Sequence, residues 1–207
     1  MSVRFSSTRK ILSVFVPIVL GLAGCSTTGM PPAPATAASP NYNYIIGPGD
    51  MINVVVRGNP DLSVTVPVRP DGKITTPLAK DIVAIGKDST ALSHEIEAAL
   101  KKYINEPTVD VIVTTFVGPY SEQIRVVGEA SKPQVLPYKQ KMTLLDVMIA
   151  VGGVTDFADG NHASILRTAE GNKQYSIKIA DLLKRGDISA NVEMRPGDVV
   201  IIPQGWF

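Results

Sequence analysis

The residues best suited to chemistry are one cysteine and two histidines. Cys25 is the only cysteine among 207 residues, so it has no partner for an intramolecular disulfide. A lone thiol without neighbouring histidines is also a poor metal site. His94 and His162 are far apart in the sequence, and no His-x-x-x-His or Gly-x-Ser-x-Gly motif occurs. We therefore expect no catalytic residues, no cofactor and no bound metal, in a protein that is not an enzyme.

The sequence before Cys25 has the parts of a bacterial secretory signal in their usual order. It begins with a basic region: Arg4, Arg9 and Lys10. Residues 11–22 form an apolar segment of about a dozen residues, shorter than the roughly 20 that a membrane-spanning helix needs. The small residues Ala23 and Gly24 then provide a cleavage site. We expect residues 1–24 to be a signal peptide.

Leu22-Ala23-Gly24-Cys25 resembles the bacterial lipobox. The resemblance implies that the sulfur of Cys25 carries a diacylglycerol, that the chain is cut between Gly24 and Cys25, and that the new amine is acylated. Ser26 stands where an Asp would retain a lipoprotein at the inner membrane, so the implied location is the periplasmic face of the outer membrane. The alternatives are a plain secretory signal with an incidental cysteine, or an uncleaved anchor.

The composition of the chain limits its class. The 20 basic and 19 acidic residues nearly balance, whereas a nucleic-acid-binding protein would show a basic patch or stripe. Hydrophobic residues make up 44%, which is enough for a packed core. After removal of the signal, the chain has the length of one large domain or two small ones.

Secondary structure is expected only after a flexible segment. Residues 25–43 are rich in Pro, Ala, Ser and Thr and read as a lipidated tether, of which some fifteen residues reach about 50 Å when stretched. A first unit, residues 44–120, opens with a turn at 47–50 and a strand with Ile52, Val54 and Val56 on one face. There follow a hairpin about 70–72, a helix from about 89 to 104 capped by Ser89 or Thr90, and a well-buried strand at 108–116.

The second unit, residues 121–207, has the element order of a β-grasp module. Two strands are followed by a helix at 144–151, which Thr143 and Asp146 open as a capping box. Two more strands, a short helix at 180–186 and a last strand complete the order. Pro48-Gly49-Asp50 and Pro196-Gly197-Asp198 both precede strands, so we expect Asp50 and Asp198 to brace similar turns rather than to act as functional sites.

The order of these motifs resembles one family, the Wza-type outer-membrane polysaccharide exporters. Four segments match its polysaccharide export domain: Tyr44–Asp50, Pro70–Pro77, Thr90–Asn105 and Glu106–Val113. Four more match its SLBB module: Gly128-Glu129, Pro133, Thr143–Asp146 and Ala150–Gly153. The implied fold is α+β, with an N-terminal α/β polysaccharide export domain at 44–120 followed by one SLBB-like β-grasp domain at 121–207.

The resemblance also implies a function. Copies of the chain would form an oligomeric ring that passes an exopolysaccharide or capsule glycan across the periplasm and outer membrane. Implied partners are an inner-membrane chain-length or co-polymerase protein, a separate outer-membrane β-barrel, and the glycan; nucleic acid is not among them. The present sequence stops five residues after Ile202, at Phe207, without the C-terminal amphipathic helix of long members. We therefore expect a short, periplasmic member, similar to those of exosortase-associated exopolysaccharide loci.

Two other functions fit the same residues. One is a soluble module that binds a small ligand or a glycan, because the β-grasp fold is also a binding scaffold. The other is a structural spacer in an export complex. Trp206 and Phe207 are expected either to dock on a membrane interface or neighbouring subunit, or to cover the last strand of their own domain.

Overall fold

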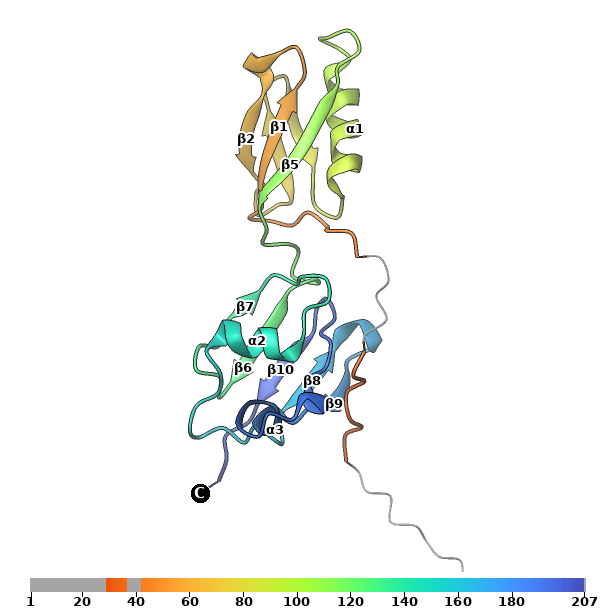
Figure 1. The fold of residues 1–207 in the computed structure, drawn as a ribbon. Helices are drawn as coiled ribbons and strands as arrows, with labels where there is room; N and C mark the ends of the chain where they lie inside the picture. The colour runs from red at the N-terminus through yellow and green to blue at the C-terminus, as the bar shows by residue number, and fades with distance from the viewer. Residues whose placement is uncertain (1–28, 37–41, 207) are drawn as a thin grey trace, which may run out of the picture.

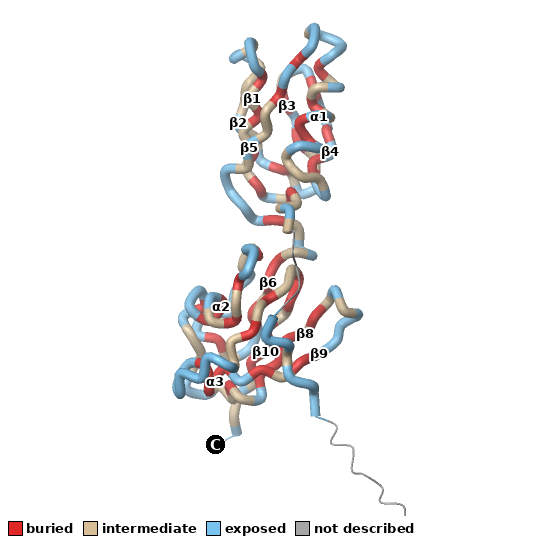
Figure 2. Tube along the Cα trace, turned by 45° about the vertical axis from the view of Figure 1, so that its right-hand side comes forward, coloured by how far each residue is buried: buried red, intermediate tan, exposed pale blue. Residues whose placement is uncertain are grey.

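Two separate hydrophobic cores organise the chain. One is built from residues between Ile46 and Val109, and the other from residues between Ile124 and Ile202. The computed structural model describes residues 29–36 and 42–206. Figure 1 shows the two units stacked end to end, and Figure 2 shows the buried residues gathered inside each of them.

The first unit is a small α/β domain with two sheets. Its main sheet is antiparallel in the order β2-β1-β5: β1 (Met51–Val56), β2 (Val64–Pro67) and β5 (Val109–Thr115). A second sheet is a hairpin of β3 (Lys73–Thr76) and β4 (Ala79–Val83). The remaining elements are the 3-10 helix η1 (Pro60–Leu62) and the helix α1 (Ser89–Leu100).

The alternation predicted for β1 is confirmed. Ile52, Val54 and Val56 are buried, whereas Asn53 and Val55 are half-buried on the other face. The buried face of β1 belongs to the same core as the apolar stripe of α1, which is formed by Leu92, Ile96 and Leu100. The cap of α1 differs from the prediction, because the Asp88 carboxylate accepts the Ala91 N–H at 2.7 Å and neither Ser89 nor Thr90 caps the helix.

Two predictions about strands in this domain were wrong. The turn at 69–72 does not join a hairpin, because β2 pairs with β1 while β3 pairs with β4. β5 is not well buried along its length; Val109 is buried, but Ile112 is 50% exposed. β-branched residues fit any half-buried pleated surface, so a run of them does not distinguish an edge strand from a central one.

The second unit is a β-grasp domain, as predicted. Its five-stranded sheet has the order β7-β6-β10-β8-β9, in which β6 and β10 are parallel and the other pairs antiparallel. The strands are β6 (Ile124–Gly128), β7 (Val135–Leu136), β8 (Ser164–Arg167), β9 (Lys173–Ser176) and β10 (Val199–Ile202). The helices are α2 (Leu144–Val151), α3 (Ile179–Lys184) and the 3-10 helices η2 (Thr168–Glu170) and η3 (Ile188–Ala190).

Helix α2 begins and ends as the sequence predicts. Thr143 accepts the Asp146 N–H and the Asp146 carboxylate accepts the Thr143 N–H, so the capping box is confirmed. Gly152 ends the helix at a φ of 76°, a left-handed conformation that glycine adopts without strain. Leu144, Val147 and Met148 are buried in the same core as the inner face of the β-grasp sheet.

Part of the predicted tether is docked on the β-grasp domain instead of free. Pro32 forms a parallel bridge with Ser176 at the end of β9. The Ser176 N–H donates to the Pro31 carbonyl at 2.9 Å, and the Ala33 N–H donates to the Ser176 carbonyl at 3.1 Å. Further along, the Glu193 N–H donates to the Ala35 carbonyl at 3.0 Å. A Pro-rich extended segment can supply carbonyl acceptors to an open sheet edge, which composition alone does not reveal.

Candidate functional site

Asp50 organises the joint between the two domains. It is fully buried, and its carboxylate accepts four hydrogen bonds. Two come from its own side of the joint: the Tyr44 hydroxyl at 2.7 Å and the Gly47 N–H at 2.9 Å. The other two come from the linker after β5: the Val117 N–H at 2.7 Å and the Gly118 N–H at 2.9 Å. The predicted turn brace is confirmed, and it also fixes where the first domain ends.

The second domain holds the same linker from the other side. Gln123 is buried, and its side-chain amide donates to the carbonyls of Val117 and Gly118 at 3.2 Å and 3.0 Å. The linker peptide therefore gives its N–H groups to the first domain and its carbonyls to the second. Gly47 packs so closely here that a Cβ would lie 2.1 Å from the Gly118 carbonyl carbon. Sequence reasoning missed the roles of Tyr44 and Gln123, because no spacing rule predicts that a tyrosine hydroxyl donates to the carboxylate of Asp50 or that a glutamine amide donates to linker carbonyls.

Asp198 closes a turn of the same design. The Arg195 N–H donates to the Asp198 carboxylate at 2.9 Å, as the Gly47 N–H does to Asp50. Gly49 and Gly197 have φ values of 91° and 80°, which the third position of a type II turn requires. The second turn also abuts the linker, because a Cβ on Gly197 would lie 2.4 Å from the Ser121 carbonyl oxygen. Its predicted role as a brace is confirmed.

The charge of Asp198 is compensated differently from that of Asp50. Arg167 is fully buried, and its Nε lies 3.6 Å from the Asp198 carboxylate, while an Nη atom donates to the Glu193 carbonyl at 3.1 Å. Glu170 pairs with Arg195 at the edge of this cluster. Burial raises the pKa of Asp198 to about 6. The hydrogen bond from the Arg195 N–H and the positive charge of Arg167 act in the opposite direction and lower this pKa. The buried arginine left no signal in the sequence.

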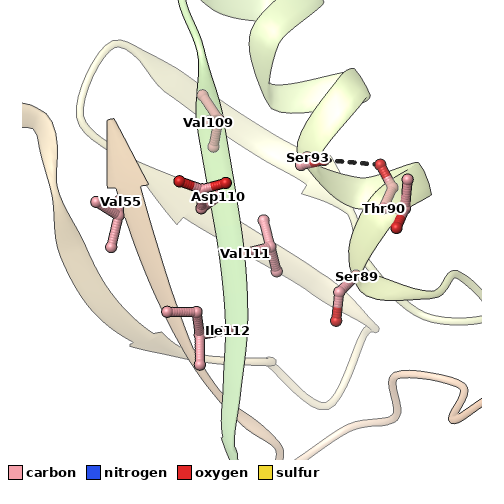
Figure 3. Close-up of a pocket in the computed structure, with 8 residues that line it drawn as sticks. All are labelled: Val55, Ser89, Thr90, Ser93, Val109, Asp110, Val111 and Ile112. Atoms are coloured by element: carbon pink, nitrogen blue, oxygen red, sulfur yellow. Dashed lines mark hydrogen bonds between the residues drawn. The ribbon is translucent and has the colours of Figure 1, made fainter. Parts of the chain in front are cut away.

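A hollow lies between β5 and the first turns of α1 (Figure 3). Its volume is about 430 Å³. Hydroxyl groups on the helix side face apolar side chains on the strand side; its lining residues are Val55, Ser89, Thr90, Ser93, Val109, Asp110, Val111 and Ile112. Asp110 is paired with Arg57 at 2.8 Å. The lining of the hollow is therefore mixed, with polar groups from α1 and mainly apolar side chains from β5.

The strand beside this hollow has an open edge. β5 pairs only with β1, and the Arg57 N–H donates to the Thr108 carbonyl at 3.0 Å. By the alternation of an antiparallel ladder, the backbone groups of Val109, Val111 and Val113 point away from β1. The Val109 N–H donates a hydrogen bond to the Glu97 carboxylate at 2.9 Å, and this bond lowers the pKa of Glu97. Val111 and Val113 have no neighbouring strand among the described residues.

The two histidines lie in different domains. His94 is on α1, 3.2 Å from Glu97, and its side chain is 72% exposed. His162 is in the loop before β8, 2.8 Å from Asp159, and is 80% exposed. Within residues 29–36 and 42–206, no three His, Cys, Asp or Glu side chains are grouped to hold a metal ion.

Near the end of the described chain, aromatic side chains flank a second hollow. Its volume is about 550 Å³, and it is lined by Phe157, Gln204, Gly205 and Trp206. Trp206 is fully exposed, so it does not cover the last strand of its own domain, which was one of the two expectations. Phe157 is 58% exposed, and its carbonyl accepts the Gly205 N–H at 2.7 Å.

Gly24, Cys25 and Phe207 lie outside the described residues. In the part of the chain that the structure describes, no helix is both long enough and apolar enough to span a membrane.

Comparisons with known proteins agree with this architecture. Residues 38–114 match the family "Polysaccharide biosynthesis/export protein", and residues 122–202 match the SLBB domain. The chain thus combines a polysaccharide export domain with an SLBB domain, in that order. The two matches and their order support a polysaccharide export protein of the Wza type.

Three curated relatives are similar over much of the chain. The EPS I polysaccharide export outer membrane protein EpsA of Ralstonia nicotianae is 26% identical over 185 residues, covering 78% of this chain and 47% of the relative. EpsA of Ralstonia solanacearum is 28% identical over 181 residues, covering 76% and 47%. The capsule polysaccharide export protein BexD of Haemophilus influenzae is 26% identical over 134 residues, covering 64% and 32%. The chain spans about half the length of the EpsA relatives that it matches.

Proposed function

We propose that this protein is a periplasmic subunit of a channel that exports an exopolysaccharide or capsule glycan. The observation that carries the proposal is the succession, in one chain, of a polysaccharide export domain and a β-grasp SLBB domain. Relatives with this similarity are named polysaccharide export outer membrane proteins. A lipid on Cys25 would hold the subunit at the periplasmic face of the outer membrane. An inner-membrane co-polymerase and an outer-membrane β-barrel are the proposed neighbours in the pathway.

We further propose that the subunits assemble into a ring through their first domains. Support comes from the open edge of β5, where the backbone groups of Val111 and Val113 have no neighbouring strand among the described residues. Beside this edge, Ile112 and Phe116 are 50% and 53% exposed. An open strand edge with exposed apolar side chains is the kind of surface that natural proteins pair with another chain or cover.

The test of the function is deletion of the gene in the organism that carries it, followed by complementation. The deletion strain should lose surface polysaccharide while polymer accumulates inside the cell envelope, and the full-length gene should restore secretion. Normal secretion without the gene would contradict the proposal. Negative-stain images of the detergent-extracted lipoprotein test the ring separately, since a uniformly monomeric protein would exclude it.

A further inference from the structure

The docked N-terminal segment limits how far the β-grasp domain can stand from the proposed lipid. The backbone contacts at Ser176 begin at Pro31, and the Ser176 hydroxyl also lies 3.3 Å from the Met30 carbonyl. Four residues lie between Cys25 and Met30, so the five steps from one Cα atom to the next span at most about 18 Å. A lipid on Cys25 would therefore hold this domain next to the bilayer that contains the acyl chains.

The docked segment reaches the end of the domain that points away from the first domain. Pro32 and Ala33 share a small hollow with Ser189 and Ala190 of η3. Figure 1 shows residues 29–36 entering at the end where α3 and the C-terminal residues lie, with the first domain at the opposite end. Figure 2 shows the same arrangement from a second direction.

The same end presents aromatic side chains to the outside. The tail is fixed by backbone contacts, because the Asp159 N–H donates to the Pro203 carbonyl at 2.9 Å and Gln204 forms a bridge with Ala158. Trp206 is fully exposed and Phe157 is 58% exposed, on either side of an uncharged hollow. Ile188, in η3, is 68% exposed. Trp is enriched where proteins meet the membrane–water interface, because its ring is apolar and its N–H remains hydrated.

We propose that this end of the β-grasp domain, with Trp206 and Phe157, lies on the phospholipid surface into which Cys25 is anchored. The inference rests on the lipid attachment in the proposed function. It assigns the aromatic hollow to a bilayer surface, because the segment that leads to Cys25 docks at the same end of the domain. The first domain would then point into the periplasm.

Trp206 is the only tryptophan of the chain, so its fluorescence tests the proposal directly. The mature lipoprotein would be purified in detergent, its mass measured to confirm the lipid, and then reconstituted into phosphatidylethanolamine–phosphatidylglycerol vesicles. We expect the emission to shift to shorter wavelength, and lipids brominated near the headgroup to quench most of it. Phe157→Ser should reduce the quenching without removing the lipid.

The matched control moves the tryptophan to the far end of the molecule. Tyr103, just after α1 in the first domain, is 61% exposed, so Tyr103→Trp combined with Trp206→Phe should show unquenched emission. If the lipidated wild-type protein behaves like this control, the proposed membrane contact is wrong, whereas the lipid attachment at Cys25 is unaffected by the result. If Cys25 carries no lipid, both are wrong. A shift to shorter wavelength without quenching, or a response only to purified glycan, would assign Trp206 to a protein or sugar contact and overturn the proposal.

Discussion

At the scale of single residues, two buried aspartates show how one turn design serves two electrostatic settings. Asp50 is surrounded by four hydrogen-bond donors, none of them a charged group. Asp198 has one backbone donor and the buried guanidinium of Arg167 at 3.6 Å. Burying a carboxylate is costly unless hydrogen bonds or an opposite charge compensate it. The two aspartates should therefore respond differently to mutation.

Asp50→Ala should unfold the first domain more easily. The substitution leaves buried N–H groups at Gly47 and Gly118 without an acceptor, and each such group costs about 1–3 kcal/mol. We expect the free energy of unfolding in urea to fall by about 3 kcal/mol or more. Tyr44→Phe is the matched control, because it removes one of the four hydrogen bonds and should cost only about 1 kcal/mol. Equal losses for the two variants would contradict the role assigned to Asp50.

Asp198 should make the protein more stable in mild acid. Its pKa is raised from 3.8 to about 6, so the folded state binds a proton that the unfolded chain has already lost in this range. This contribution is fully present below pH 3.8 and is lost as the pH rises through about 6. Between about pH 7 and pH 5, the stability of the wild type should rise relative to Asp198→Asn. Parallel pH profiles of urea unfolding for the two proteins would show that Asp198 does not titrate in this way.

At the scale of elements, the start of α1 distinguishes the structure from the sequence prediction. The structure assigns the cap to Asp88, whereas the sequence suggested Ser89 or Thr90. Asp88→Ala should therefore lower the free energy of unfolding by about 1 kcal/mol. Ser89→Ala and Thr90→Ala serve as controls and should change it by less than about 0.5 kcal/mol. A larger loss at position 89 or 90 than at 88 would favour the sequence prediction.

The edge of β5 is the element on which assembly is proposed to depend. Ile112→Lys places a charge on the exposed face of this strand, the kind of change that blocks pairing at sheet edges. We expect smaller particles in native mass spectrometry of the detergent-extracted protein, with unchanged thermal stability of the monomer. Ile149→Lys, at a 71% exposed position on α2, is the control and should leave assembly intact. Rings that persist in the Ile112 variant would exclude this edge as the contact.

The sequence predicted elements better where the signal was local. The Thr143–Asp146 capping box, the alternation in β1 and the element order of the β-grasp domain were all readable from spacing. The strand with which β2 pairs could not be predicted from spacing, because the choice between β1 and β3 depends on contacts distant in sequence. The docking of Pro31–Ala35 was missed for the same reason, since any extended segment can offer carbonyl acceptors to an open edge.

At the scale of the whole molecule, location is proposed to depend on Cys25. Cys25→Ala should abolish acylation and leave the protein either free in the periplasm or uncleaved at the inner membrane. Each buried CH₂ of an acyl chain contributes about 0.8 kcal/mol, so two or three chains anchor a protein stably where one does not. Membrane fractionation and labelling with radioactive palmitate would check this. A variant that still fractionates with the outer membrane would show that another part of the protein holds it there.

The docked segment also decides how the molecule bears mechanical load. If the lipid is the fixed point, a pull on the β-grasp domain can reach Cys25 by two routes. One runs through the linker held by Asp50 and Gln123, through the first domain and back along the chain that precedes Tyr44; the other runs directly through the bonds at Ser176. These last bonds join a short segment to the end of one strand, so they are the weakest link in that path. Strong tension would peel the segment away and lengthen the attachment by several residues before either core is disturbed. The docked N-terminal segment would thus be the first contact to break when the subunit is pulled away from the membrane.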